Sequence, residues 1–217
     1  MPAQPSQKSP AKAPPVLRAD ARENRERILT AAREAYALHG IDVPMATIAR
    51  RAGVGVATLY RRFPTRASLV TEAFAEQLAH CVSALDEGLA DPDPWRGFCS
   101  VIERVCLMQA SERGFTQAFL GQFPDHAGYA EERARAEEGL ARLIRRAQDA
   151  GQLRPDFTVG DATLVLLANS GAAAGAGPDG PAASRRLVAY LLQSFRAPGA
   201  APLPPPVRLD LERILDR

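Results

Sequence analysis

Hydroxyl and guanidinium side chains crowd a short stretch in the first third of the chain. Within nine positions the sequence places Thr58, Tyr60, Arg61, Arg62 and Arg66. Hydroxyls and guanidinium groups reach phosphate oxygens, and a guanidinium also pairs with the edge of guanine. The stretch is suited to contacting nucleic acid, provided that one element presents these side chains together.

The elements that would position them form a helix, a tight turn and a second helix. Apolar residues at helical spacing predict a helix over about 44–52, and the glycines of 53–55 interrupt the period. Helical spacing resumes over 56–63, with Leu59 and Phe63 on the apolar face that we expect in the core. Two short helices joined in this way make a helix-turn-helix, whose second helix fits the DNA major groove.

The segment IARRAGVGVATLYRRFPTRASL resembles the DNA-binding signature of the TetR family of transcriptional regulators. The matching residues are Ile48-Ala49, Ala52-Gly53-Val54, Thr58-Leu59-Tyr60 and Phe63-Pro64. The resemblance covers about residues 20–75, and the remainder is similar in helical layout and length. It implies an all-α fold of about nine helices, in which a three-helix head precedes a larger effector-binding and dimerising bundle.

We expect four segments along the chain. They are a disordered arm over 1–18, the DNA-binding head over 19–66, the helical body over 67–197 and a Pro-rich tail over 198–217. Residues 1–66 carry twelve Lys and Arg against five Asp and Glu, a net charge of +7, whereas the rest of the chain carries −5. A basic first third is the electrostatic footprint of a module that binds a polyanion.

Each candidate DNA contact has an expected role. Val56 and Ala57 would make apolar contact with a thymine methyl, and Arg61 would donate to a base, guanine by preference. Thr58, Tyr60 and Arg66 would hold the DNA backbone. Arg62 and Thr47 complete the candidate set.

Two positions depart from the family pattern. Many relatives place Thr or Ser where this chain has Val43-Pro44, which can neither cap the helix nor bond a phosphate. The variable pair of the signature, often polar, is Gly55-Val56 here.

The chain before the helix-turn-helix leaves two alternatives open. Lys8, Lys12 and Arg18 either touch DNA or belong to a solvated tail. From Asp20 an amphipathic helix runs to about Gly40, and its Arg22 and Arg25 either reach phosphate or stay on a solvated face.

After Thr65, a candidate helix cap, a single long helix from Arg66 to about Leu89 would connect head and body. Further helices are expected over about 95–113, 115–123, 126–150, 160–175 and 182–196, with Thr158 or Asp161 as a cap. The Gly- and Ala-rich residues 171–181 are expected to form a flexible loop. The sequence shows no period-two alternation of apolar and polar residues, so we expect no sheet.

Aromatic and sulfur-containing side chains gather in the first half of the body. Such side chains suit a plastic apolar pocket, although an ordinary helical core would use them too. The family resemblance favours a pocket for a small apolar effector. The candidate lining residues are Trp95, Phe98, Cys99, Met108, Phe115, Phe119 and Phe123.

The last two body helices have broad apolar faces. In the family the corresponding helices pair with a second copy, which implies a homodimer on a palindromic duplex operator. The two recognition helices would then lie about 34–36 Å apart, one turn of B-DNA. Candidate interface residues are Leu164, Leu167, Leu187, Tyr190 and Leu191.

Other chemistries find little support. There is no metal-ligand spacing, phosphate loop or nucleophile motif, so we expect no metal, no cofactor and no enzyme activity. With no membrane span, no signal peptide and only three cysteines, a cytoplasmic protein is expected. The sequence thus predicts a repressor released from its operator by a small apolar effector. The alternative is a ligand-independent or thiol-responsive regulator, or an activator.

Overall fold

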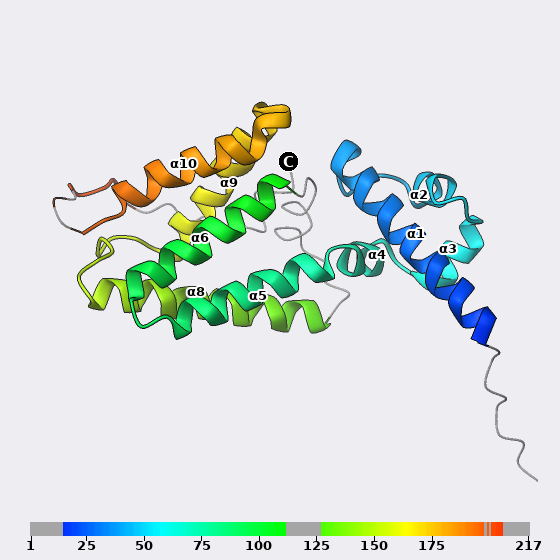
Figure 1. The fold of residues 1–217 in the computed structure, drawn as a ribbon, viewed down its shortest axis with the longest axis horizontal. Coiled ribbons are helices and arrows are strands. Elements are labelled where there is room, and N and C mark those ends of the chain that lie inside the picture. The colour runs from blue at the N-terminus through cyan, green and yellow to red at the C-terminus, as the bar shows by residue number, and fades with distance from the viewer. Residues whose placement is uncertain (1–14, 112–126, 198, 200, 206–217) are drawn as a thin grey trace, which may run out of the picture.

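The computed structural model describes residues 15–111, 127–197, 199 and 201–205. Over these ranges the chain forms nine α-helices and one short 3-10 helix, and the only β-structure is an isolated bridge between Leu153 and Arg196. The predicted all-α fold is confirmed. Figure 1 shows a small helical head and a larger helical body, joined through α4. Within the same ranges, no helix has both the length and the apolarity that a membrane crossing needs.

The head consists of α1 (Pro15–His39), α2 (Met45–Arg51) and α3 (Val56–Arg62), with α4 (Arg66–Ala73) packed against α1. Helix α1 begins five residues before the Asp20 start that we expected, because proline suits the first turn of a helix. Its apolar residues recur every three or four positions and are buried: Ile28, Leu29, Ala32, Ala35 and Tyr36. This buried stripe is the surface on which α2 and α3 pack.

The predicted single connector helix is wrong, because the chain breaks at Phe74. Helix α4 ends at Ala73 and α5 (Ala75–Ala90) starts afresh, with Phe74 between them at φ −114° and ψ 15°. The Phe74 ring lies 6.0 Å from the ring of Tyr36, inside the head's core. The break therefore arises from packing against α1, and no local helix breaker in the sequence announces it.

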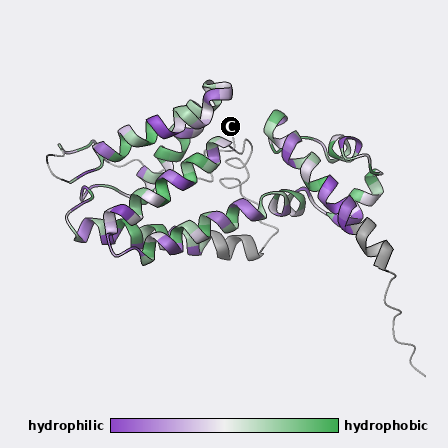
Figure 2. Cartoon of the chain, in the orientation of Figure 1, coloured by the Kyte–Doolittle hydropathy of each residue, from purple (hydrophilic) through white to green (hydrophobic). Residues whose placement is uncertain are grey.

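The body consists of α5, α6 (Pro94–Ser111), α8 (Ala127–Asp149), α9 (Val159–Gly175) and α10 (Gly180–Ser194). Helix α6 contacts the other four, and α5 packs against it in antiparallel orientation after a short turn (Figure 1). The two helices approach closely at Gly88 and Gly97, where a Cβ on Gly97 would lie 2.3 Å from the Gly88 carbonyl oxygen. Figure 2 shows apolar and polar residues alternating along these helices, as expected when one face is buried. The helix predicted over 115–123 lies outside the described residues.

Two predictions about α9 have different outcomes. Thr158 and Asp161 were alternative caps, and the structure uses both, since each side chain bonds the other residue's backbone amide. The flexible loop predicted over 171–181 is wrong: α9 continues to Gly175, and the 3-10 helix Gly177–Asp179 leads directly into α10. Alanine-rich sequence favours helix, and the turn needs only Gly177, whose φ is +56°.

Part of the predicted Pro-rich tail is fastened to the body. The buried Arg154 guanidinium bonds the Asp156 carboxylate and donates to the Ala201 carbonyl at 2.6 Å. The same carboxylate accepts a hydrogen bond from the Leu203 amide. Residues 206–217, including the remainder of that tail, lie outside the described residues.

Candidate nucleic-acid interface and effector cavity

The turn between α2 and α3 fixes which way α3 faces. Gly53 adopts a φ of +66°, and the Val54 amide bonds the Ala49 carbonyl at 3.0 Å, which folds the chain back sharply. On α3, Leu59 is fully buried, and Phe63, which follows the helix, is 1% exposed. The prediction that these two residues belong to the core is confirmed. The opposite face of α3 must therefore point to solvent.

That outer face holds most of the candidate DNA contacts. Val56 and Tyr60 are 42% and 47% exposed. Ala57, Arg61 and Arg62 are exposed beside them. Thr58 and, on α2, Thr47 are half-buried. Tyr60, Arg61 and Arg62 have no hydrogen-bond or ion-pair partner among the residues that the structure describes, so their polar ends are available.

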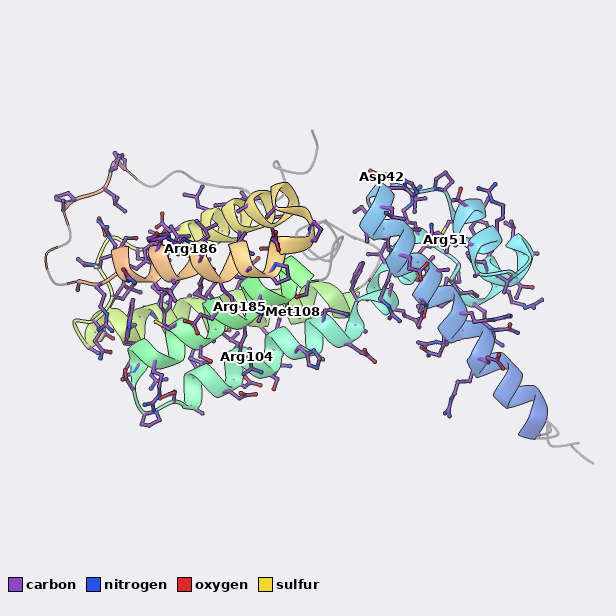
Figure 3. The ribbon with its side chains drawn as sticks, turned by 45° about the horizontal axis from the view of Figure 1, so that its top comes forward. Asp42, Arg51, Arg104, Met108, Arg185 and Arg186 are labelled. Atoms are coloured by element: carbon purple, nitrogen blue, oxygen red, sulfur yellow. The ribbon has the colours of Figure 1, made fainter. Side chains whose placement is uncertain are left out.

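Other cations of the head have partners that the sequence pattern did not reveal. Arg66 forms an ion pair with Asp42 at 2.8 Å, which ties the start of α4 to the loop after α1. Arg51 pairs with Glu34 at 3.0 Å (Figure 3 labels Asp42 and Arg51). Arg25 pairs with Glu72 of α4. Exposed pairs of this kind contribute little to stability, so Arg66 can exchange its carboxylate for another anion.

The described residues include little of the basic N-terminal arm. Lys8 and Lys12 lie outside the described residues, and α1 includes Arg18 without a described side chain. Arg22, on the first turns of α1, is exposed.

An apolar cavity of about 100 Å³, open to solvent on one side, lies among α5, α6, α8 and α9. Its wall is almost entirely aliphatic: Cys81, Leu85, Val101, Ile102, Val105, Ala136, Glu137, Leu140, Ala162 and Leu166. Leu85 and Ala136 also line a second, more polar cavity of about 600 Å³ between α5 and α8, so the two cavities adjoin there.

Among the candidates that the structure describes, Trp95, Phe98, Cys99 and Met108 are not part of the wall of this apolar cavity. Trp95 and Phe98 are buried in an aromatic cluster with Phe157 and Phe195, at ring distances of 4.8–5.7 Å. Cys99 is half-buried, and Met108 packs against the head's core and lines a groove between α5 and α6. Phe115, Phe119 and Phe123 lie outside the described residues. Sequence reasoning missed the aliphatic residues on one face each of α5, α6, α8 and α9, which form the wall of this cavity.

The three cysteines are poorly suited to redox sensing. Cys81 and Cys106 are buried and Cys99 is half-buried. Burial raises the pKa of each thiol to about 12. Reactive cysteines need a stabilised thiolate, so these thiols remain protonated and unreactive at neutral pH.

The outer faces of α9 and α10 are apolar and partly exposed. Leu164 and Tyr190 are 44% and 58% exposed, and Leu167, Leu187 and Leu191 are half-buried. Small residues on α9, absent from our sequence prediction, continue this face: Ala168, Gly171, Ala174 and Gly175 are exposed. A Cβ built on Gly171 or Gly175 meets nothing within 4 Å, so no described residue of the chain covers these positions.

Comparison with known proteins extends over head and body. Residues 28–73 match the family described as "Bacterial regulatory proteins, tetR family". Residues 93–197 match the family described as "Transcriptional regulator SbtR-like, C-terminal domain". No match was found among curated proteins.

Solved structures that this chain resembles are transcriptional regulators. A regulator from Streptomyces coelicolor is 29% identical, with 81% of this chain and 99% of that chain covered and a TM-score of 0.51. One from Mycobacterium vanbaalenii is 31% identical, covering 83% and 99%, with a TM-score of 0.48. FadR from Bacillus subtilis, solved in complex with stearoyl-CoA, is 16% identical, covering 77% and 97%, with a TM-score of 0.52.

Both family matches lie on the parts of the fold described above, the first on the helix-turn-helix head and the second on the helical body. The relative that shares 31% of its residues is covered over almost its whole length. The chain belongs to the TetR family of transcriptional regulators: it is a DNA-binding regulator with an SbtR-like C-terminal domain, and not an enzyme.

Proposed function

We propose that this protein is a homodimeric repressor that binds an inverted-repeat operator through α3 and is released from it by a small apolar effector. The observation that carries the proposal is the outer face of α3. Tyr60, Arg61 and Arg62 are exposed and unpartnered among the described residues, while Leu59 and Phe63 anchor the helix from behind. Guanidinium and hydroxyl groups without a partner in the protein are free to donate to phosphates and base edges.

On DNA, some of these residues contact bases and the others contact phosphates. Val56 and Ala57, at the start of α3, make apolar contact with bases, and Arg61 donates to a base edge. Thr47, Thr58, Tyr60, Arg62 and Arg66 contact phosphates. Arg66 leaves Asp42 for a phosphate, an exchange between two anions that costs little at the surface.

The α9 and α10 faces pair with a second copy. Leu164, Leu167, Leu187, Tyr190 and Leu191 provide apolar contact area, and Gly171 and Gly175 let two backbones approach closely. A two-fold axis there would present two heads to successive major grooves.

Effector binding acts through the joint at Phe74. Helix α4 shares the head's core with α1, so head and α4 move together. Cys81 belongs to this same core and also lines the apolar cavity, and Val105 packs against both cores while lining that cavity. A ligand that spreads the cavity wall therefore pushes directly on residues that position the head. FadR, which holds stearoyl-CoA, supports ligand binding by a body of this shape.

The thiol-responsive alternative is disfavoured by the burial of all three cysteines and their raised pKa values. A ligand-independent regulator or an activator is the remaining alternative. The test is fluorescence anisotropy on a duplex from the region upstream of the protein's own gene, with and without compounds that raise its melting temperature. Release by such compounds supports the proposal. Operator affinity that no stabilising compound alters would leave a ligand-independent regulator.

A further inference from the structure

Helix α2 carries a cation, Arg50, that is absent from the predicted set of DNA contacts. Arg50 is exposed and has no hydrogen-bond or ion-pair partner among the residues that the structure describes. Its neighbour Arg51, which Figure 3 labels, is already engaged, because its guanidinium donates to the Glu34 carboxylate of α1 at 3.0 Å. Two adjacent arginines of one short helix therefore differ in whether a carboxylate binds them.

Most carboxylates described in the head already bind other arginines. They come from α1, from the loop after it and from α4, and the pairs are Arg25–Glu26, Arg25–Glu72, Arg51–Glu34 and Arg66–Asp42. Arg50 is thus an exposed cation without a direct counter-ion in the described part of the head. The guanidinium fork fits the geometry of phosphate, so the backbone of a duplex can supply the missing anion.

Helical spacing fixes the direction in which Arg50 leaves α2. The buried residues of this helix form one stripe, which consists of Met45, Ile48 and Ala49. At about 100° per residue, Thr47 and Arg50 lie one turn apart on the side opposite to the stripe. Arg51 lies at the edge of that side which faces α1, as its bond to Glu34 shows. Arg50 therefore shares the outward face of α2 with Thr47, a candidate phosphate contact.

Arg50 also lies next to the turn that leads into α3. Its backbone carbonyl accepts a hydrogen bond from the Gly53 amide at 3.2 Å, within the turn itself. Among the described residues, a Cβ built on Gly53 meets nothing within 4 Å, and one built on Gly55 meets the Thr58 hydroxyl oxygen at 3.9 Å. The turn is therefore bare of side chains at both glycines, and a duplex that α3 enters can approach the end of α2.

Two places in the helix-turn-helix lack a side chain that could donate to phosphate. They are Val43-Pro44 before α2 and Gly55-Val56 at the start of α3, and neither helix has a side-chain N-cap. Val56 and Ala57 would contact bases through apolar groups, which do not hold the DNA backbone. Phosphate contacts fix the register of a protein on the duplex, so a donor near the turn is needed. Arg50 is the nearest guanidinium along the chain that is not already paired.

We infer that Arg50 donates to an operator phosphate beside the start of α3, and that it supplies the backbone contact which Gly55 and Val56 cannot make. The inference rests on the proposed recognition of an operator through α3. Unlike Arg66, which must first leave Asp42, Arg50 has no carboxylate to release when DNA arrives. The contact adds affinity and a dependence on salt, and it carries no preference for a base.

The experiment compares wild type, Arg50→Ala, Arg50→Lys and Arg51→Ala by fluorescence anisotropy on the operator and its single-base variants, over a series of salt concentrations. Arg50→Ala should weaken binding about tenfold on every duplex, the effect of one charge-assisted hydrogen bond. It should also lower the slope of log K against log salt by about 0.9, the value for one lost phosphate contact. Arg50→Lys keeps the charge and should restore the slope.

Arg51→Ala is the matched control, because it removes the same charge one position away and should leave the slope unchanged. Its loss also frees the Glu34 carboxylate, which would enlarge any general effect of charge and so makes the comparison stringent. Melting temperatures check that the variants remain folded. If Arg50→Ala does not fold, Arg50→Gln removes the charge with a smaller change in size and gives the same slope test.

Several outcomes overturn the inference: a wild-type slope in Arg50→Ala, an equal loss in Arg51→Ala, or a slope that Arg50→Lys fails to restore. A preference relaxed at one base pair would make Arg50 a base contact and would overturn it too. Arg61→Ala is measured in parallel. Loss of binding in Arg61→Ala with wild-type behaviour in Arg50→Ala contradicts this inference alone, whereas a wild type that binds no duplex contradicts the proposed function as well.

Discussion

The guanidinium of Arg33 on α1 donates a 3.2 Å hydrogen bond to the backbone carbonyl of Ala73, the last residue of α4. At a helix end this carbonyl would otherwise lack a partner. Together with the Tyr36–Phe74 ring contact, the bond fixes the end of α4 to the head at the point where the connector breaks. The change of direction between head and body thus lies at Phe74, and Cys81 of α5 continues the head's core beyond it.

Removing that bond should weaken the coupling between effector and operator. In Arg33→Met the end of α4 is held less firmly, so the body's state should no longer set the head's orientation. Coupling between two sites is commonly worth about 5–150-fold in affinity, and we expect the ratio of operator affinities without and with effector to fall toward one. Anisotropy titrations measure it. Arg27→Met is the control, because Arg27 bonds Asn24 on its own helix and, among the described residues, has no bond to α4. An unchanged ratio in Arg33→Met would place the joint elsewhere.

Arg61 and Arg62 should have different roles on DNA. Arg61→Ala should cost about 1–3 kcal/mol on the preferred operator and relax the preference at one base pair in each half-site. Arg62→Ala should weaken binding to all sequences alike and reduce the dependence of log K on log salt by about 0.9 per lost phosphate contact. Titrations over operator variants and salt concentrations separate the two effects.

Arg142→Ala, which removes an exposed charge from the body, is the control for net charge in these titrations. Uniform weakening by Arg61→Ala would make Arg61 a phosphate contact instead.

Gly171 should be essential for dimerisation and dispensable for the protomer. Its Cβ position is open, so Gly171→Leu fits the isolated chain and even raises helix propensity by up to about 1 kcal/mol. The leucine would separate two paired α9 helices, and sedimentation should show dissociation at concentrations where the wild type is dimeric. Arg145→Leu adds a leucine to the exposed surface of α8 and should leave the dimer intact. A dimer in Gly171→Leu as stable as the wild type would locate the interface on another surface.

The fastening of the C-terminal segment should depend on pH. The hydrogen bond from Arg154 lowers the pKa of Asp156 to about 2 from its ordinary 3.8. A carboxyl with a depressed pKa in the folded protein stabilises it above about pH 4, and this contribution is lost as pH falls toward 2. The melting temperature of Asp156→Asn should therefore lie below that of wild type at pH 6, with the gap closing between pH 4 and 2. A gap independent of pH would assign the effect to packing alone.

The sequence predicts local features of this fold well and tertiary ones poorly. Leu59, Phe63 and the Thr65 cap follow from spacing within a few residues, and the structure has all three in place. The break at Phe74 was missed because it depends on tertiary contacts: the Phe74 ring packs against Tyr36, and Arg33, forty positions before Ala73, bonds the Ala73 carbonyl.

The candidate sites also combine features that the local sequence predicts with features that depend on tertiary contacts. The outer face of α3 could be predicted, since one buried leucine fixes the register of a seven-residue helix. Trp95 and Phe98 looked like pocket residues, yet they pack against Phe157 and Phe195, which no local pattern connects with them. The burial of Asn169 in an apolar segment could not be predicted, because it depends on hydrogen bonds to Cys106 and Gln109 on another helix.

The most direct measurement is selection of binding sites from a random duplex library by the wild-type protein and by Tyr60→Ala/Arg61→Ala. Both residues are exposed, so the double variant should remain folded. The wild type should enrich an inverted repeat whose half-sites are centred about 10 base pairs, or a multiple of one helical turn, apart. The double variant should enrich nothing. Failure of the wild type to enrich any duplex, or enrichment of the same repeat by both proteins, would contradict recognition through the outer face of α3.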